Sequence, residues 1–246
     1  MALVAALALI TAGFTAAGGA LALRSRDRLH LVLGLAAGLL LGLVAFDLIP
    51  EIFRLNTSVV GGVPLVSLAL VGGFLALHIA EHTFGAHEPV ESDYGDNHEH
   101  THNVAGTLGA LAMAGHIFLD GMALGVAFQV SNALGLAVFI ATIGHAFSDG
   151  LNTVSLLIKS GHWNSRAIFL LFVDAIMRLS GAALGSYVAL SDRTLGIYLA
   201  IFAGFVIYLS TSHILPEAHA RHSSRYTLLF TAIGVVAMWL VVGALG

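Results

Sequence analysis

The chain has no cysteine and very few charged residues. Of its 246 residues, 10% are charged and 58% are hydrophobic, whereas soluble domains carry about 25% charged residues. The lack of cysteine excludes disulfides and thiolate metal sites, and it disfavours soft ions such as Cu(I). A net charge of −4 without a basic patch argues against nucleic-acid binding. These scarcities predict an integral membrane protein.

The apolar runs are continuous rather than alternating, which favours helices over a barrel. We predict an all-α bundle of eight transmembrane helices, forming one domain over residues 1–246. Each run is near the length of about 20 residues that a bilayer needs. The first run has no basic residues before it, so we expect a retained helix rather than a cleaved signal. The eight predicted spans are about 2–23, 29–52, 60–84, 104–130, 133–158, 165–190, 195–217 and 226–245.

Basic residues in the loops predict the orientation of the bundle. Two of them, Arg54 and Arg193, lie on one side, and seven lie in alternate loops on the other. Basic loops face the cytoplasm, so we expect both termini outside and a multi-pass protein of the cell (inner) membrane. The seven are Arg24, Arg26, Arg28, Lys159, Arg166, Arg221 and Arg225.

One loop, residues 85–103, is polar, acidic and rich in histidine. It cannot build a core, so we expect a flexible cytoplasmic segment. Two interpretations stay open: a loose site for a divalent metal, or a solvated linker. The histidines concerned are His87, His98, His100 and His102.

A heptapeptide, Gly-His-x-Phe-x-Asp-Gly, occurs at Gly115–Gly121 and again at Gly144–Gly150, each time within an apolar run. Each copy places a histidine and an aspartate four residues apart, on one face of a helix. A charged group at the centre of a membrane helix costs about 2.5–3.5 kcal/mol on insertion scales. The connection between the two runs is short, so the helices should be antiparallel neighbours whose polar pairs converge.

The four polar residues of the two copies are His116, Asp120, His145 and Asp149. Imidazole nitrogen and carboxylate oxygen suit Zn²⁺, and they are acceptable to Fe²⁺ or Mn²⁺. Two aspartates at matched depth would balance one divalent ion, so we predict a metal site. The alternative is a pair of helix-packing hydrogen bonds with no ion.

Two further residues are candidates for this site. Asp174, in the sixth span, either contacts the ion or forms a salt bridge with Arg178 one turn later. Asn152 follows Asp149 by three residues, and it could add an oxygen ligand or a hydrogen bond to one.

A second internal repeat is Asp47-Leu-Ile-Pro-Glu51 in the second span and His213-Ile-Leu-Pro-Glu217 in the seventh. The predicted topology places the two near opposite membrane faces, which is typical of transporters built from inverted repeats. We predict that Asp47 and Glu51 form an outer entry, and that His213 and Glu217 form an inner exit. The alternative is a set of ordinary interfacial polar residues.

With these features the chain resembles the ZIP (Zrt/Irt-like protein) family of divalent metal transporters over most of its length. The resemblance rests on the eight spans, the histidine-rich loop after the third, both heptapeptides, and Leu-Pro-Glu in the seventh. It implies uptake of Zn²⁺, as transported substrate, into the cytoplasm, with Fe²⁺ or Mn²⁺ as alternatives. It further implies an elevator-like movement of helices one, four, five and six against the rest. The partners would be the metal, membrane lipid and, because dimers are common in the family, a second copy in a homodimer.

The sequence departs from the family pattern at several positions, including aspartates where the family often has glutamates. Ile117 and Ala146 stand where many members have polar residues that help to hold a second ion, so we expect one principal ion. Ser148 replaces a usual proline. The competing interpretations are an intramembrane zinc-dependent hydrolase and a metal sensor or storage protein. The hydrolase is the first alternative to transport, and the lack of an obvious separate general base argues against it.

Overall fold

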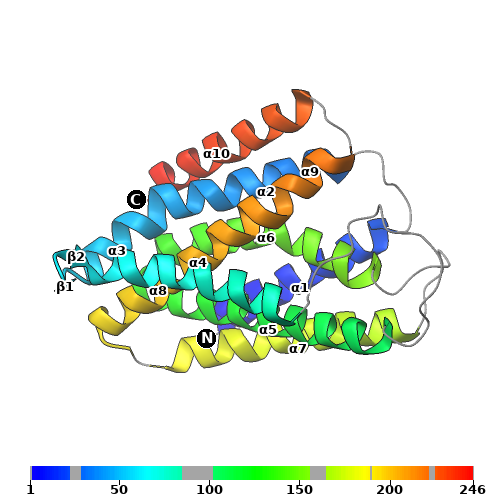
Figure 1. Cartoon of the computed structure of the whole chain (residues 1–246), viewed down its shortest axis with the longest axis horizontal. Helices are drawn as coiled ribbons and strands as arrows, with labels where there is room; N and C mark the ends of the chain where they lie inside the picture. Colours follow the sequence, from blue (N-terminus) through cyan, green and yellow to red (C-terminus); the bar gives the residue numbers. More distant parts are fainter. Residues whose placement is uncertain are drawn as a thin grey trace.

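The computed structural model describes residues 2–22, 29–84, 102–155, 165–188, 190–221 and 225–245. The histidine-rich loop predicted over 85–103 lies outside this description, apart from its last two residues. Within the described residues the chain is a bundle of eight helical rods with one short hairpin (Figure 1). The all-α prediction is therefore confirmed.

Six of the eight rods are single helices, and two contain a short π-helical turn. The second rod comprises α2 (Leu29–Leu43), η1 (Val44–Leu48) and α3 (Ile49–Leu55); the seventh comprises α8 (Asp192–Tyr208), η2 (Leu209–Ile214) and α9 (Leu215–Arg221). The others are α1 (Ala2–Ala22), α4 (Leu65–Phe84), α5 (His102–Val130), α6 (Asn132–Ser155), α7 (Ser165–Tyr187) and α10 (Arg225–Leu245).

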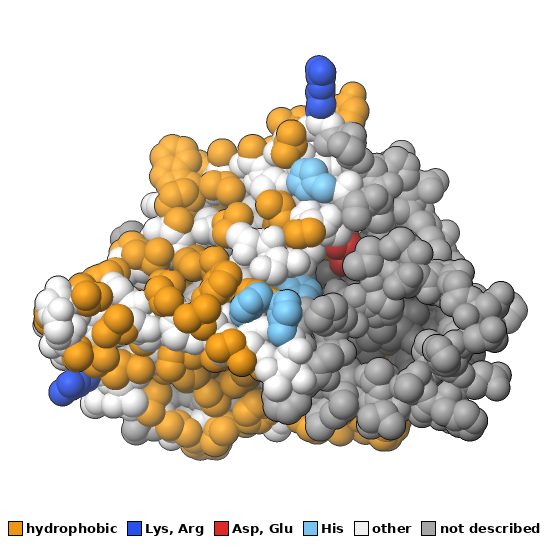
Figure 2. Space-filling view, viewed as in Figure 1, with side chains coloured by type: hydrophobic (Ala, Val, Ile, Leu, Met, Phe, Trp, Pro, Cys, Tyr) orange, Lys and Arg blue, Asp and Glu red, His pale blue; other side chains and the backbone are white. Residues whose placement is uncertain are grey.

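The rods have the composition of membrane helices. Among the described residues, five are long and apolar enough to cross a membrane, and three more contain shorter apolar stretches: Leu65–Ala80, Ala114–Val130 and Asn132–Ala146. Apolar side chains cover much of the described surface in Figure 2. On α10, for example, Trp239 and Leu240 are each 60% exposed, which suits a surface in contact with lipid.

The third predicted span began too early. A hairpin of β1 (Val59–Val60) and β2 (Val63–Pro64) precedes α4, which begins at Leu65 rather than at residue 60. Gly61 and Gly62 have positive φ angles of 60° and 82°, the backbone conformation of a tight hairpin turn that glycine adopts easily. An apolar pattern alone did not reveal this turn.

The two proline-containing repeats lie at opposite ends of the bundle, as predicted. Figure 1 shows α3 beside the hairpin and α9 at the other end. In each rod the π-helical turn lies just before the proline, which has no N–H to donate. The N–H of Ile49 donates to Val44 O, and the N–H of Leu215 donates to Ser210 O. Both wider turns were absent from the sequence prediction.

The helices pack in two groups. In the first, α5 packs on α7 and α1 on α6, with α5 also against α6; in the second, α2 packs on α10 and α4 on α8. The principal contact between the groups is α2 against α6. The first group contains helices one, four, five and six of the bundle, which is the division that the family resemblance implied.

Within each group, glycines bring the helix backbones into direct contact. A Cβ at Gly121 of α5 would overlap the carbonyl oxygen of Arg178 in α7, and one at Gly181 of α7 would overlap that of Phe118. In the other group, a Cβ at Gly73 of α4 would overlap the carbonyl of Ile201 in α8. Membrane helices associate through such small residues because lipid supplies little hydrophobic driving force.

The neighbouring glycines Gly72 and Gly73 provide a matched test of this packing. We expect Gly73→Ala to lower the thermal unfolding midpoint in detergent, because overpacking a close helix contact typically costs about 1–3 kcal/mol. Gly72→Ala should not lower it, because a Cβ there meets nothing within 4 Å. Equal destabilisation by both variants would contradict the α4–α8 contact described here.

Candidate metal centre

The two histidine–aspartate pairs lie on α5 and α6, which run antiparallel. The helices are separated by the single residue Ser131, whose hydroxyl accepts a hydrogen bond from the N–H of Leu134 at 3.0 Å. This is a helix N-cap, which satisfies a donor at the start of α6. Because the connection is so short, the chain reverses direction directly after α5. Both polar pairs therefore lie at the same depth in the bundle, as the sequence predicted.

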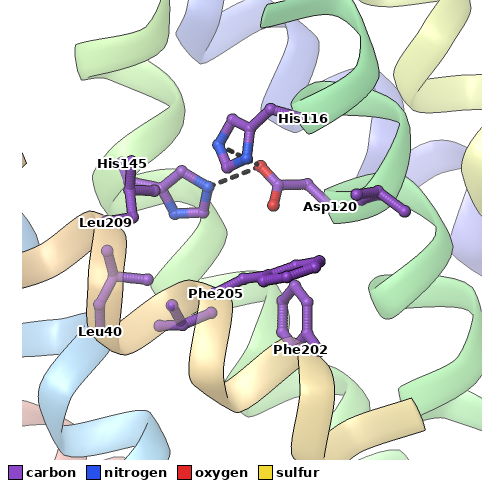
Figure 3. Close-up of a pocket in the computed structure, with 9 residues that line it drawn as sticks. Leu40, His116, Asp120, His145, Phe202, Phe205 and Leu209 are labelled. Carbon is purple, nitrogen blue, oxygen red and sulfur yellow. Dashed lines mark hydrogen bonds and ion pairs between the residues drawn. The ribbon is translucent and has the colours of Figure 1, made fainter. Parts of the chain in front are cut away.

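The side chains of His116, Asp120, His145 and Asp149 converge, and their ligand atoms all lie within 4.8 Å of one another. His145 Nε2 is 2.7 Å from Asp120 Oδ2, and His116 Nε2 is 3.5 Å from the same oxygen (Figure 3). Each histidine Nε2 is also 4.0 Å from an oxygen of Asp149. The four residues thus form one group shared by two helices.

Three members of the group are buried: Asp120, His145 and Asp149. The side chain of His116 is 24% exposed, and its Nε2 has no hydrogen-bond partner. Buried carboxylates need paired or coordinating cations, because an isolated charge in an apolar interior is costly. The group therefore has the chemistry of a cation site, with the buried Nε2 of His116 left to bind a cation.

The donor set fits a zinc ion. Zn²⁺ takes imidazole nitrogen and carboxylate oxygen at about 2.0–2.2 Å, which places ligand atoms of a tetrahedral site about 3.4 Å apart. The spacings in the group scatter around this value, so small side-chain movements would suffice. Two nitrogens and two carboxylates also suit Fe²⁺ or Mn²⁺.

One wall of the site comes from the other helix group. A cavity of about 10 Å³ adjoins His116, Asp120 and His145, roughly the space of one water molecule. Its apolar wall, partly labelled in Figure 3, consists of Leu40 of α2 with Phe202, Phe205, Val206 and Leu209 of the seventh rod. An ion held here would have lost most of its hydration shell.

A cation that the motif did not predict is Arg178 of α7. It is 1% exposed, its Nη2 lies 3.5 Å from Asp149 Oδ2, and its Nη1 lies 3.8 Å from Asp120 Oδ2. From the sequence we related Arg178 only to Asp174, the residue one helical turn earlier. Its partners on α5 and α6 depend on tertiary packing, for which the local spacing gave no signal.

Asp174 is buried in α7 but does not belong to the group of four. Its contact with an ion stays a prediction. Asn152 lies within α6, and its side chain is outside the described part of the structure. Its role as a ligand or hydrogen-bond donor is likewise a prediction.

The predicted outer residues are distributed along the second rod. Asp47 is half-buried in the π-helical turn. Glu51 forms a two-bonded ion pair with Arg54, and one of these bonds, from Nε to Oε2, measures 2.7 Å. Glu51 is therefore partly neutralised by a residue of its own helix. The entry role of both acids stays a prediction.

The predicted inner residues lie beside an aromatic cluster. His213 has a ring contact of 5.5 Å with Tyr208, and Tyr208 in turn meets His78 at 5.6 Å. The rings of His78 and His82 are in tilted contact, with centroids 4.3 Å apart, and histidine side chains reach the surface on the face shown in Figure 2. Glu217 is half-buried in α9. Tyr208, which joins the third and seventh rods, was not anticipated.

The geometry defines a class of protein: a helical membrane protein with two packed helix groups and a buried nitrogen–oxygen ligand group beside their interface. A family model described as ZIP Zinc transporter matches residues 85–242. The chain belongs to the ZIP zinc transporter family. The family is one of transporters, as predicted, and not of enzymes.

Individual relatives agree with this membership. Zinc transporter YKE4 of Saccharomyces cerevisiae is 25% identical over 227 residues, which cover 82% of this chain and 65% of that protein. Zinc transporter SLC39A7 of Rattus norvegicus is 30% identical over 58% of this chain and 32% of its own length. Zinc transporter ZIP4 of Homo sapiens is 29% identical over 53% of this chain and 21% of its own length. The chain thus spans less than two thirds of each of these relatives.

Zinc should stabilise the purified protein through the group of four. A ligand at about 100 times its Kd adds about 2.7 kcal/mol to stability, so we expect zinc to raise the thermal unfolding midpoint in detergent. His145→Ala should remove most of this increase, because it deletes a buried ligand. His30→Ala, which alters a histidine outside the group, should retain it. An unchanged zinc effect in His145→Ala would show that zinc binds elsewhere.

Proposed function

We propose that the protein is a secondary carrier that takes up divalent metal, with zinc as its principal substrate, through the cell membrane into the cytoplasm. The observation that carries this proposal is the convergence of two histidines and two aspartates between neighbouring membrane helices. Zinc is proposed first because the donor set suits it and because the relatives named above are zinc transporters. Fe²⁺ and Mn²⁺ are alternative substrates.

The proposed cycle uses the two helix groups. Metal reaches Asp47 and Glu51, loses water, and binds His116, Asp120, His145 and Asp149. The group of α1, α5, α6 and α7 then moves past the group of α2, α4, α8 and α10, so that the metal leaves towards His213 and Glu217. In support, all four ligands lie on α5 and α6, while the apolar wall facing them comes from α2, α8 and η2. The metal would then travel with its ligands.

A membrane potential could drive this uptake. Moving two charges through 100 mV is worth about 4.6 kcal/mol, and we propose an inward-negative potential as the driving force for a step that moves net charge. The proposed surroundings are the lipid of the cell (inner) membrane, with a second copy of the chain in a homodimer. The exposed apolar side chains of α10 support contact with lipid or with a second copy of the chain.

Zinc flux into proteoliposomes tests the proposal directly. With a fluorescent zinc indicator inside the vesicles, the wild-type protein should give uptake that depends on external zinc. His116→Ala and Asp149→Ala should each reduce the initial rate at least tenfold, because each removes a ligand. His30→Ala should transport normally. Unchanged flux in both ligand variants would refute the proposal.

Uptake should also weaken in acid. A histidine must be unprotonated to bind metal, so added protons compete with zinc for His116 and His145. At fixed zinc concentration and fixed potential, lowering the external pH from about 7.5 to about 5.5 should raise the zinc concentration that gives half-maximal uptake. A half-maximal concentration that falls on acidification would contradict imidazole ligation.

A further inference from the structure

Arg178 lies deeper than any other basic residue whose side chain the structure describes. It is 1% exposed, and its position at the α5–α7 contact is enforced by the backbone. Gly121 directly follows Asp120, and a Cβ at Gly121 would overlap the carbonyl oxygen of Arg178. The close approach at Gly121 therefore brings the guanidinium beside the ligand group.

The neighbours of the Arg178 guanidinium do not satisfy all of its hydrogen-bond donors. Its distances to Asp120 Oδ2 and Asp149 Oδ2 are 3.8 Å and 3.5 Å, which is long for a charge-assisted hydrogen bond. Its Nη1 is buried without a hydrogen-bond partner. A tight structural salt bridge would satisfy this donor, since an unsatisfied buried donor costs about 1–3 kcal/mol. The geometry is that of a cation held near the carboxylates but not locked onto them.

The charges of the ligand group leave little room for a second divalent ion. With both imidazoles neutral, as metal binding requires, Asp120 and Asp149 contribute −2 and Arg178 contributes +1, giving −1, and all three charged groups are buried. Guanidinium does not lose its proton in proteins, so this +1 is permanent. One bound M²⁺ brings the sum to +1, whereas a second would bring it to +3 in an apolar interior, which is costly.

We propose that Arg178 is a built-in counter-cation that limits the metal centre to one divalent ion and weakens its hold on that ion. The inference rests on the proposed function. Arg178 acts as a positioning and specificity residue: it shares Asp120 and Asp149 with the metal without being a ligand. Its charge lowers the affinity for zinc, so the ion can leave, and it keeps the emptied site at −1 instead of −2.

The test is zinc binding by Arg178→Gln in the purified full-length protein, measured by equilibrium dialysis with metal analysis and by competition with a chelator. We expect one zinc per wild-type chain. Arg178→Gln should bind zinc at least tenfold more tightly or take up a second ion, because the site becomes −2. Arg178→Lys, which keeps the charge, should bind one zinc with nearly wild-type affinity. Arg193→Gln, at an exposed arginine, should match the wild type.

A second neutral variant separates the loss of charge from structural damage. Arg178→Met also makes the site −2, so it should tighten zinc binding as Arg178→Gln does. Misfolding would weaken zinc binding instead of tightening it. If Arg178→Gln does not fold, Arg178→Met against Arg178→Lys still measures the effect of the charge.

The outcomes distinguish this inference from the proposed function. Zinc binding by the wild type with unchanged affinity and stoichiometry in folded Arg178→Gln would overturn the role of Arg178 alone, as would weaker binding in that variant. A wild type that binds no zinc and shows no flux would overturn the proposed function, and the inference with it.

Discussion

The structure depends on one constraint, which is the cost of keeping carboxylates away from water inside a membrane. Asp120 and Asp149 are buried together in the ligand group, and a third aspartate, Asp174, is buried in α7. Neighbouring imidazoles and a guanidinium surround two of them, yet the sum of charges remains negative. The helix packing at Gly121 holds this arrangement in place. A region of this kind is stable only with a cation nearby, and this need links the fold to the metal binding that we propose.

The contacts within each helix group differ in kind from the contacts between the two groups. Tight glycine contacts lie within each group, where backbones touch, whereas the ligands of one group face apolar side chains of the other, such as Phe202 and Phe205. A smooth apolar wall makes few specific bonds that a sliding movement would break. Close backbone contacts within each group and apolar side-chain contacts between the groups suit the elevator-like movement that we propose.

Most of the fold and the centre of the site could be predicted from the sequence. Continuous apolar runs predicted the eight rods, and the spacing of His116 with Asp120 and of His145 with Asp149 predicted their convergence. The hairpin at Gly61 was missed because valines on both sides continue the apolar pattern. The partners of Arg178 were missed because they lie on other helices, and spacing along one helix reports only local neighbours. Tyr208 has no sequence signal beyond an aromatic ring in an apolar run.

The π-helical turns η1 and η2 change the direction in which the glutamate side chains that follow them point. A π turn accommodates one residue more than the α-helix around it, and each residue rotates an α-helix by about 100°. The single extra residue in Val44–Leu48 therefore decides which way Glu51 points, and that in Leu209–Ile214 does the same for Glu217. The two rods share this one-residue offset at opposite ends of the bundle, so the same backbone feature sets the direction of an acidic side chain near each end.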